Sequence, residues 1–370
     1  MSKTTAHTIG VLAEQTEQFQ VDQLRQFYVN KGISIEKTGS DDIYESVMEL
    51  LNASDFIATI PSEKDVELLL NALFSLIITF QGEQVLQLVQ KFCQLVTNKN
   101  YQGQGWQSNA GVAVRVLSNF FHFHADQPEL QIIELVHLLK LCGRAHLTSF
   151  LDTSAEKIDE YAVKWRLSLD QKRELLRLWH SSLLEDGRHD AAAEVMTALL
   201  KTYAEDADSA KEDARECVRT AVIDPNSFAF DHLLRLSAVK RLEQTDSQMH
   251  QILKIFVEGR LNDYKNFIAK NPSFVKEQMG VDEGILEKKI KMLTLISMAE
   301  TTQVLSLTDI SKALDIPDEE ELEEFIIDVI RMKAINGKID EKRLSSLLGG
   351  LKWAHANIRD TNSKSKLEQE

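Results

Sequence analysis

The apolar positions between residues 286 and 347 follow the spacing of buried helix faces. Four of them recur at intervals of four, three and three residues, which predicts an amphipathic helix, and these are Leu286, Ile290, Leu293 and Ile296. The apolar pair Val304-Leu305 follows this helix. Because this pair is so short, it predicts no more than one strand, at the edge of a small sheet.

A short second helix and a longer third helix are predicted next. Ser306 and Asp309 have the spacing of a capping box, in which the Ser306 hydroxyl caps the helix and Asp309 reaches back to the Ser306 amide. Pro317 suits the first turn of the third helix, where no intrahelical amide bond is lost. The buried face of the third helix is predicted to consist of Leu322, Phe325, Ile326, Val329 and Ile330.

Two short segments after the third helix are predicted to form a β-wing. Asn336-Gly337 and Glu341-Lys342 separate residues 338–340 from residues 344–347. The succession of helix, edge strand, two helices and hairpin is the order of a winged helix.

The charge of the third helix argues against binding to a DNA duplex. Arg331 and Lys333 are its only cations, and both lie at its far end, whereas its first turns carry Glu319, Glu320, Glu321, Glu323 and Glu324. Duplex binding depends on cations that release phosphate counterions, and this helix would place carboxylates beside phosphate. The carboxylates also stabilise a helix N-terminus through the macrodipole. We therefore expect the winged helix to dock on protein.

Helix–turn–helix pairs fill most of the chain before the winged helix. Apolar spacing predicts helices at residues 11–29, 43–57, 61–80, 83–97, 112–124, 128–142, 154–165, 168–185, 189–203 and 206–222. The pairs recur at intervals of about 35–45 residues, the range of helical-repeat arrays. Ser168 and Gln171 form a second predicted capping box. We expect an all-α solenoid in which each pair buries one face on its neighbour.

The segment between the array and the winged helix contains two phenylalanines two residues apart. Asp224 is expected to cap a helix with Pro225 in its first turn, and Phe228 and Phe230 are expected to be buried there as structural residues. Short helices at residues 248–257, 261–268 and 273–279 then lead directly into the winged helix. We therefore expect the array and the winged helix to form one rigid unit.

Composition argues against several classes of protein. The 370 residues carry a formal net charge of −15, which argues against a general binder of polyanions. Cys93, Cys142 and Cys217 are odd in number and widely separated, which argues against a disulfide framework or a zinc site. The most apolar run, residues 68–80, is shorter than the roughly 20 residues of a membrane span. A cytoplasmic protein without a membrane segment is expected.

A helical array joined to a winged helix with an acidic third helix resembles the PCI domain. This domain is shared by the proteasome lid, the signalosome and eukaryotic translation initiation factor 3. Within this group, three segments closely resemble the subunit M family of initiation factor 3: KEDARECVRTAVIDP, DPNSFAFDHLLRLSAVKRLE and EEFIIDVIRMKAINGKID. The likeness extends more loosely from about residue 20 to residue 340.

The resemblance implies a right-handed solenoid of the TPR or HEAT type, capped by the winged helix. It also implies a non-catalytic scaffold in initiation factor 3, which promotes assembly of the preinitiation complex on the 40S ribosomal subunit and recruitment of mRNA. The implied partners are other PCI and MPN subunits and, through the complex, the 40S subunit. No cofactor, specific DNA, membrane or small-molecule substrate is expected. The alternative is a subunit of, or shared with, the signalosome or the proteasome lid.

PCI subunits, by resemblance, join through the edges of their winged helices and through bundled C-terminal helices. In this sequence a stripe from Leu347 onward predicts a last amphipathic helix. The predicted interface comprises Val304, Leu305, Lys338, Ile339, Leu344, Leu347, Leu351, Ala354 and Ile358. Phe325 and Ile326 join Phe228 and Phe230 as predicted structural residues.

These expectations divide the chain into five parts. Residues 1–42 form an N-terminal helix and linker, and residues 43–205 form the solenoid. Residues 206–284 form the helical repeats of the PCI domain, residues 285–348 the winged helix, and residues 349–370 the last helix and tail.

One histidine pair offers a rival, enzymatic interpretation. His122 and His124, followed by Asp126, resemble the first ligands of zinc metalloprotease-like subunits of related complexes. The serine and aspartate that complete that motif are replaced here by Ile132 and Leu135. Residues two apart on a helix also point to different faces. We therefore expect a structural or surface role for both histidines and no metal site.

Overall fold

The chain forms two compact units, residues 1–195 and residues 196–370. The computed structural model describes residues 16–33, 35, 42–97, 106–152, 154–204, 206–302, 304–332, 334–340 and 347–353, and at residues 58, 106–108 and those after Ile335 only the backbone is described. The expectation that the array and the winged helix form one rigid unit stays a prediction. Each unit is described by itself.

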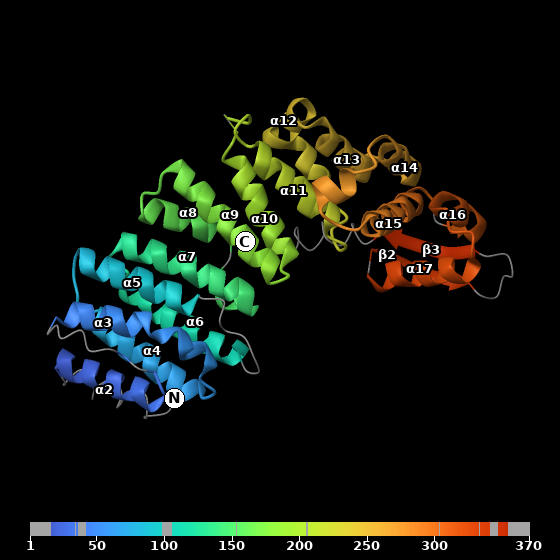
Figure 1. Cartoon of the computed structure of the whole chain (residues 1–370). Helices are drawn as coiled ribbons and strands as arrows, with labels where there is room; N and C mark the ends of the chain where they lie inside the picture. The colour runs from blue at the N-terminus through green and yellow to red at the C-terminus, as the bar shows by residue number, and fades with distance from the viewer. Residues whose placement is uncertain are drawn as a thin grey trace, which may run out of the picture. The chain divides into compact units, whose positions relative to one another are not determined.

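The first unit is a two-layered helical array (Figure 1). Helices α2, α4 and α6 contact one another in succession in one layer, and α3, α5, α7 and α9 do so in the other. Its α-helices are α2 (Glu17–Asn30), α3 (Ile43–Asn52), α4 (Glu63–Ile77), α5 (Glu83–Val96), α6 (Trp106–Phe123), α7 (Pro128–Ala145), α8 (Ala155–Lys164), α9 (Leu169–Glu185) and α10 (His189–Lys201), and α10 continues into the second unit. The predicted helical-repeat fold is confirmed.

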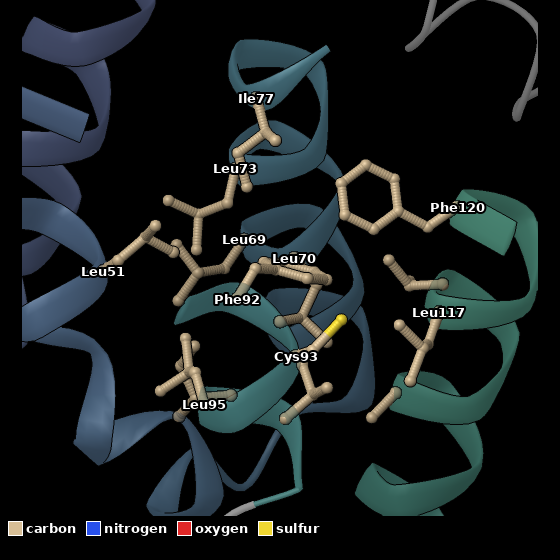
Figure 2. Packing of buried hydrophobic residues seen from close by; sticks show 14 of the residues in the cluster. Leu51, Leu69, Leu70, Leu73, Ile77, Phe92, Cys93, Leu95, Leu117 and Phe120 are labelled. Atoms are coloured by element: carbon tan, nitrogen blue, oxygen red, sulfur yellow. The ribbon is translucent and has the colours of Figure 1, made fainter. Parts of the chain in front are cut away.

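The core of this unit lies between the two layers. Figure 2 shows buried side chains from α3, α4, α5 and α6 meeting in one cluster. Fully buried Leu70, Leu73, Phe92 and Phe120 belong to it, and the Phe92 and Phe120 rings pack edge to face at 5.2 Å. Burying each such side chain stabilises the fold by about 1.5–3 kcal/mol. The four-and-three spacing of the sequence therefore marks faces that are buried.

The helix start predicted at Ser168 is present in the structure. The capping box of α9 is present, with the Ser168 hydroxyl accepting from the Gln171 amide and the Gln171 side chain accepting from the Ser168 amide. Some predicted boundaries were wrong. The predicted helix at 43–57 ends at Asn52 and is followed by a 3-10 segment, η1 (Ser54–Thr59). Helix α6 begins at Trp106, six residues earlier than the predicted start at 112.

A short 3-10 segment and a close helix contact lie after and within α7. The 3-10 helix η2 (Thr148–Phe150) follows α7, and the Asp186 carboxylate at the end of α9 accepts from the Thr148 amide at 3.0 Å. Helices α7 and α9 also approach closely at Gly143. A Cβ atom there would lie 2.9 Å from the Ser182 backbone, so glycine is required for the close contact.

The second unit begins with a bundle of short helices. Its elements before the winged helix are α11 (Lys211–Ile223), η3 (Asp231–Arg235), α12 (Ser237–Thr245), α13 (Ser247–Glu258), α14 (Leu261–Lys270) and the π-helical turn η4 (Val275–Met279). The helix predicted to begin after Asp224 is absent from this part of the chain. Asp224 instead ends α11, and its carboxylate accepts from the Asn226 amide at 3.0 Å, which closes a local turn before the 3-10 segment.

A winged helix completes the second unit (Figure 1). Its elements are α15 (Glu283–Thr301), β1 (Val304–Ser306), α16 (Leu307–Leu314), α17 (Glu319–Arg331), β2 (Ile335–Asp340) and β3 (Leu347–Trp353). The strands are antiparallel and ordered β1-β3-β2, with Leu305 opposite Leu348 and Ile339 opposite Leu348 on the other side. The predicted winged-helix order is confirmed.

Two details of the winged helix differ from the predictions. Pro317 precedes α17, whose N-cap is Asp318, accepting from the Glu321 amide at 2.8 Å. Ser306 does cap α16, but its hydroxyl accepts from the Thr308 amide at 3.2 Å, so the bond lies one residue earlier than in a capping box. Both differences shift a cap by one or two residues and leave the helix faces unchanged.

Candidate subunit interface

Strand β1 lies at an edge of the sheet. It pairs with β3 on one side, and in the described sheet its other side has no partner strand. Val304 is 48% exposed, whereas Leu305 is 6% exposed and points into the domain. An edge strand of this kind presents unpaired amides and carbonyls that another strand can bind. Leu305 therefore anchors the strand in the domain, and the Val304 side chain is left exposed.

The predicted wing residues that the structure describes lie on the central strand of the sheet and on the strand at its far edge. Lys338 and Ile339 lie in β2, and Leu347 lies in β3 opposite both Ser306 and Asp340. The wing itself is longer than predicted, because β2 begins at Ile335. Leu344 lies outside the described residues.

The predicted C-terminal helix is wrong where the structure describes it. Leu347 and Leu351 both lie in strand β3, which pairs with both neighbouring strands. Their spacing of four places them on one face of a helix, but an even spacing also places them on one face of a strand. The pairing of β3 with β1 and β2 shows that both residues lie in a strand and not in a helix. Ala354 and Ile358 lie outside the described residues.

Helix α17 presents an acidic surface. Glu319, Glu320, Glu321, Glu323 and Glu324 are all exposed. On the opposite face Leu322, Ile326 and Val329 are buried, and Phe325 is partly buried. Asp328 is shared between Lys288 of α15 at 3.4 Å and Arg331 at 3.9 Å. The carboxylates of the first turns form no ion pair with another described residue, so the helix keeps a strong local negative charge.

The winged helix is tied to the preceding helices through a buried lysine. Lys289 of α15 is 2% exposed, and its Nζ donates to the backbone carbonyls of Ala221 and Asp224, each at 2.6 Å. The same Nζ lies 4.9 Å from the centre of the Phe230 ring, within the range of a cation–π contact. Burial lowers the pKa of Lys289 to about 7, with the charge of Asp224 acting in the opposite direction.

This contact gives the DPNSFAF segment a structural role. Phe230 is 3% exposed and covers the lysine, whereas Phe228 is only partly buried. The expected burial therefore holds fully for Phe230 and only in part for Phe228. Sequence reasoning missed Lys289, although one signal was present: it lies beside Ile290, three residues after Leu286, on the apolar stripe of its helix.

The two histidines of the pair have different environments, and only His124 belongs to a buried hydrogen-bonded contact. His124 and Glu134 are both buried, and the His124 Nδ1 lies 2.6 Å from a Glu134 carboxylate oxygen. Burial raises the pKa of Glu134, although the hydrogen bond to His124 lowers it. His122 points elsewhere, with its Nδ1 2.6 Å from the Ser118 carbonyl. Among the described residues, no three His, Cys, Asp or Glu side chains are grouped so that they could hold a metal ion.

Two further findings bear on the class of protein. The three cysteines are free and buried, and burial raises the pKa of each thiol. None of the helices within the described ranges is both long and apolar enough to cross a membrane.

Comparison with known proteins agrees with this architecture. The PCI domain model matches residues 268–343, which include the winged helix from α15 to β2. The chain is 30% identical to eukaryotic translation initiation factor 3 subunit M of Danio rerio over 336 residues, 90% of this chain and 87% of the relative. The subunits M of Gallus gallus and Homo sapiens are 30% and 29% identical over the same shares. The chain therefore belongs to the family of eukaryotic translation initiation factor 3 subunit M.

Proposed function

We propose that this chain is a non-catalytic scaffold subunit of the eukaryotic translation initiation factor 3 complex. Its role is to hold other PCI and MPN subunits together, so that the complex assembles the 43S preinitiation complex on the 40S ribosomal subunit and recruits mRNA. Family membership along nine-tenths of the chain supports this role. The cytoplasm is the compartment in which the chain would take part in this assembly.

The free edge of β1 is the observation that carries the docking part of this proposal. Strand addition needs a sheet edge with unpaired backbone groups and a side chain that a partner can cover. β1 offers both, because only β3 pairs with it among the described strands and Val304 is exposed beside the backbone. Leu305 anchors the strand from the buried side. The winged helix of a neighbouring PCI subunit can therefore continue the sheet.

The charge of α17 supports protein docking over nucleic-acid binding. In a groove-binding winged helix, the third helix would approach phosphate. Here its first three residues are Glu319, Glu320 and Glu321, and all are exposed. Such a surface repels a phosphate backbone and lacks the cations from which non-specific binding derives its affinity.

Affinity purification tests the proposed complex. The tagged full-length chain, expressed in its own cells and purified at physiological salt, is expected to bring down the PCI and MPN subunits of initiation factor 3 together with 40S ribosomal proteins. Mass spectrometry identifies and quantifies them. Recovery of signalosome or proteasome-lid subunits, without initiation factor 3, would overturn the assignment and favour the alternative complexes.

A further inference from the structure

The first unit carries a groove along one edge of its helical array. Helices α5, α7 and α9 contact one another in succession in the same layer, and the beginnings of all three line a depression of about 910 Å³. Its floor is apolar, with buried Val85, Leu130 and Trp165. The partly buried Leu86, Ile132 and Leu167 form its walls. This volume exceeds what a single side chain fills and lies within the range of sites for bound molecules.

The rim of the groove is predominantly acidic. Glu83 lies in the first turn of α5 and Glu129 in the first turn of α7, and both are exposed. Neither forms an ion pair with another residue that the structure describes. Arg166, in the connection between α8 and α9, is the one cation among the lining residues. An occupant must therefore cover apolar floor while meeting two carboxylates and one guanidinium.

The spacing of the helices sets the spacing of the charges on the occupant. Neighbouring packed helices lie about 8–10 Å apart, so the carboxylates of Glu83 and Glu129 are expected to be separated by a similar distance. An extended chain advances about 3.3 Å per residue, so three residues span that distance. Two cationic side chains three positions apart would reach both carboxylates. Successive side chains of an extended chain point to opposite sides, so one of the two apolar side chains between them would face the groove floor, and the long basic side chains would bend toward the rim from either side.

We propose that this groove, which Glu83 and Glu129 flank, is a docking site for an extended segment of a partner protein with two basic residues three positions apart and large apolar residues between them. The Arg166 guanidinium would donate to a backbone carbonyl of the segment. Trp165 is held in place from the buried side, because its Nε1 donates to the Gln131 side-chain oxygen at 3.1 Å. The site lies in the first unit, so it is independent of docking through the winged helix.

A labelled peptide with the core Lys-Leu-Phe-Lys tests the proposal on the full-length chain by fluorescence polarisation. Two peptides of the same length serve as comparisons, one with Glu-Leu-Phe-Glu and one with Lys-Gly-Gly-Lys. The first peptide is expected to bind, and each comparison peptide is expected to bind at least about tenfold more weakly, because Glu-Leu-Phe-Glu loses both ion pairs and Lys-Gly-Gly-Lys loses the apolar contact with the floor.

Variants of the chain locate the binding. Glu83→Gln with Glu129→Gln is expected to weaken binding of the Lys-Leu-Phe-Lys peptide about tenfold. Glu83→Lys with Glu129→Lys is expected to bind the Glu-Leu-Phe-Glu peptide more tightly than the Lys-Leu-Phe-Lys peptide. The matched variant Glu194→Lys with Glu243→Lys makes the same change in net charge at exposed residues that do not line the groove. It should bind the first peptide like the unchanged chain. Absence of binding to the unchanged chain, or equal binding by the groove variants and the matched variant, would overturn the proposal.

Discussion

The close contact between α7 and α9 makes Gly143→Ala the most sharply defined perturbation of the array. A Cβ atom at this position would lie 2.9 Å from both the Cα and the carbonyl oxygen of Ser182, and 3.1 Å from a Glu185 carboxylate oxygen. Two of these atoms belong to the backbone, so they cannot turn away as a side chain can. The helices must therefore separate locally to admit the methyl group.

The expected magnitude follows from two opposed terms. Admitting an extra carbon to a packed contact costs about 1–3 kcal/mol. Replacing glycine by alanine in a helix gains up to about 1 kcal/mol through backbone propensity. Gly111 of α6 provides the control, because it is also helical and a Cβ atom there would meet nothing within 4 Å. The propensity term is common to both variants, so Gly143→Ala should be about 1–3 kcal/mol less stable than Gly111→Ala.

Thermal unfolding followed by circular dichroism measures this difference. For a unit of 150–250 residues, each kcal/mol shifts the Tm by about 2–4 °C. Gly143→Ala is therefore expected to unfold roughly 2–12 °C below Gly111→Ala, in the transition of the first unit. If Gly143→Ala were as stable as Gly111→Ala, the two helices would not be in contact at this position, and the layered packing of α7 on α9 would be refuted.

Two further predictions concern the buried lysine and its cover. The pKa of Lys289 is lowered to about 7 in the folded chain, below its ordinary value, so folding favours the neutral amine. The free energy of unfolding of the unchanged chain, relative to that of Lys289→Met, should therefore rise as the pH is raised above 7. Urea unfolding from pH 6 to pH 9 measures it. A difference between the two free energies that did not change with pH would contradict the burial of Lys289. In the same assay Phe230→Ala should lower the free energy of unfolding by about 3–5 kcal/mol. Phe228→Ala, at a partly buried ring, should lower it clearly less. Equal losses of stability would contradict the assignment of Phe230 as the ring that covers the lysine.

Much of the helical fold could be predicted because its signals are local. The Ser168 capping box lies within one turn and the four-and-three stripe of α15 within about three turns, and the structure has both. Errors at helix ends have local causes too. Asp224 can begin a helix or close a turn after one, and the sequence favours neither, because the choice depends on whether α11 has already ended.

The sheet and the candidate sites were harder to predict because they depend on distant partners. Leu347 and Leu351 suit either a helix face or a strand face, and only the pairing of β3 with β1, more than 40 residues earlier, decides for the strand. The carbonyls that accept from Lys289 lie 68 and 65 residues before it in the sequence. The groove in the first unit combines three helix beginnings that no local pattern connects.

Co-purification of an edge-strand variant tests the central claim most directly. Val304→Asp places a charge on β1, at a side chain that is 48% exposed, and Ile285→Asp makes the same change on α15 at a side chain that is 45% exposed. Because both side chains are about half exposed, both variants should melt close to the unchanged chain. Quantitative mass spectrometry of the tagged chains should show that Ile285→Asp recovers the PCI and MPN subunits of initiation factor 3 and that Val304→Asp loses most of them. Equal recovery by the two variants would contradict docking through the free edge of β1.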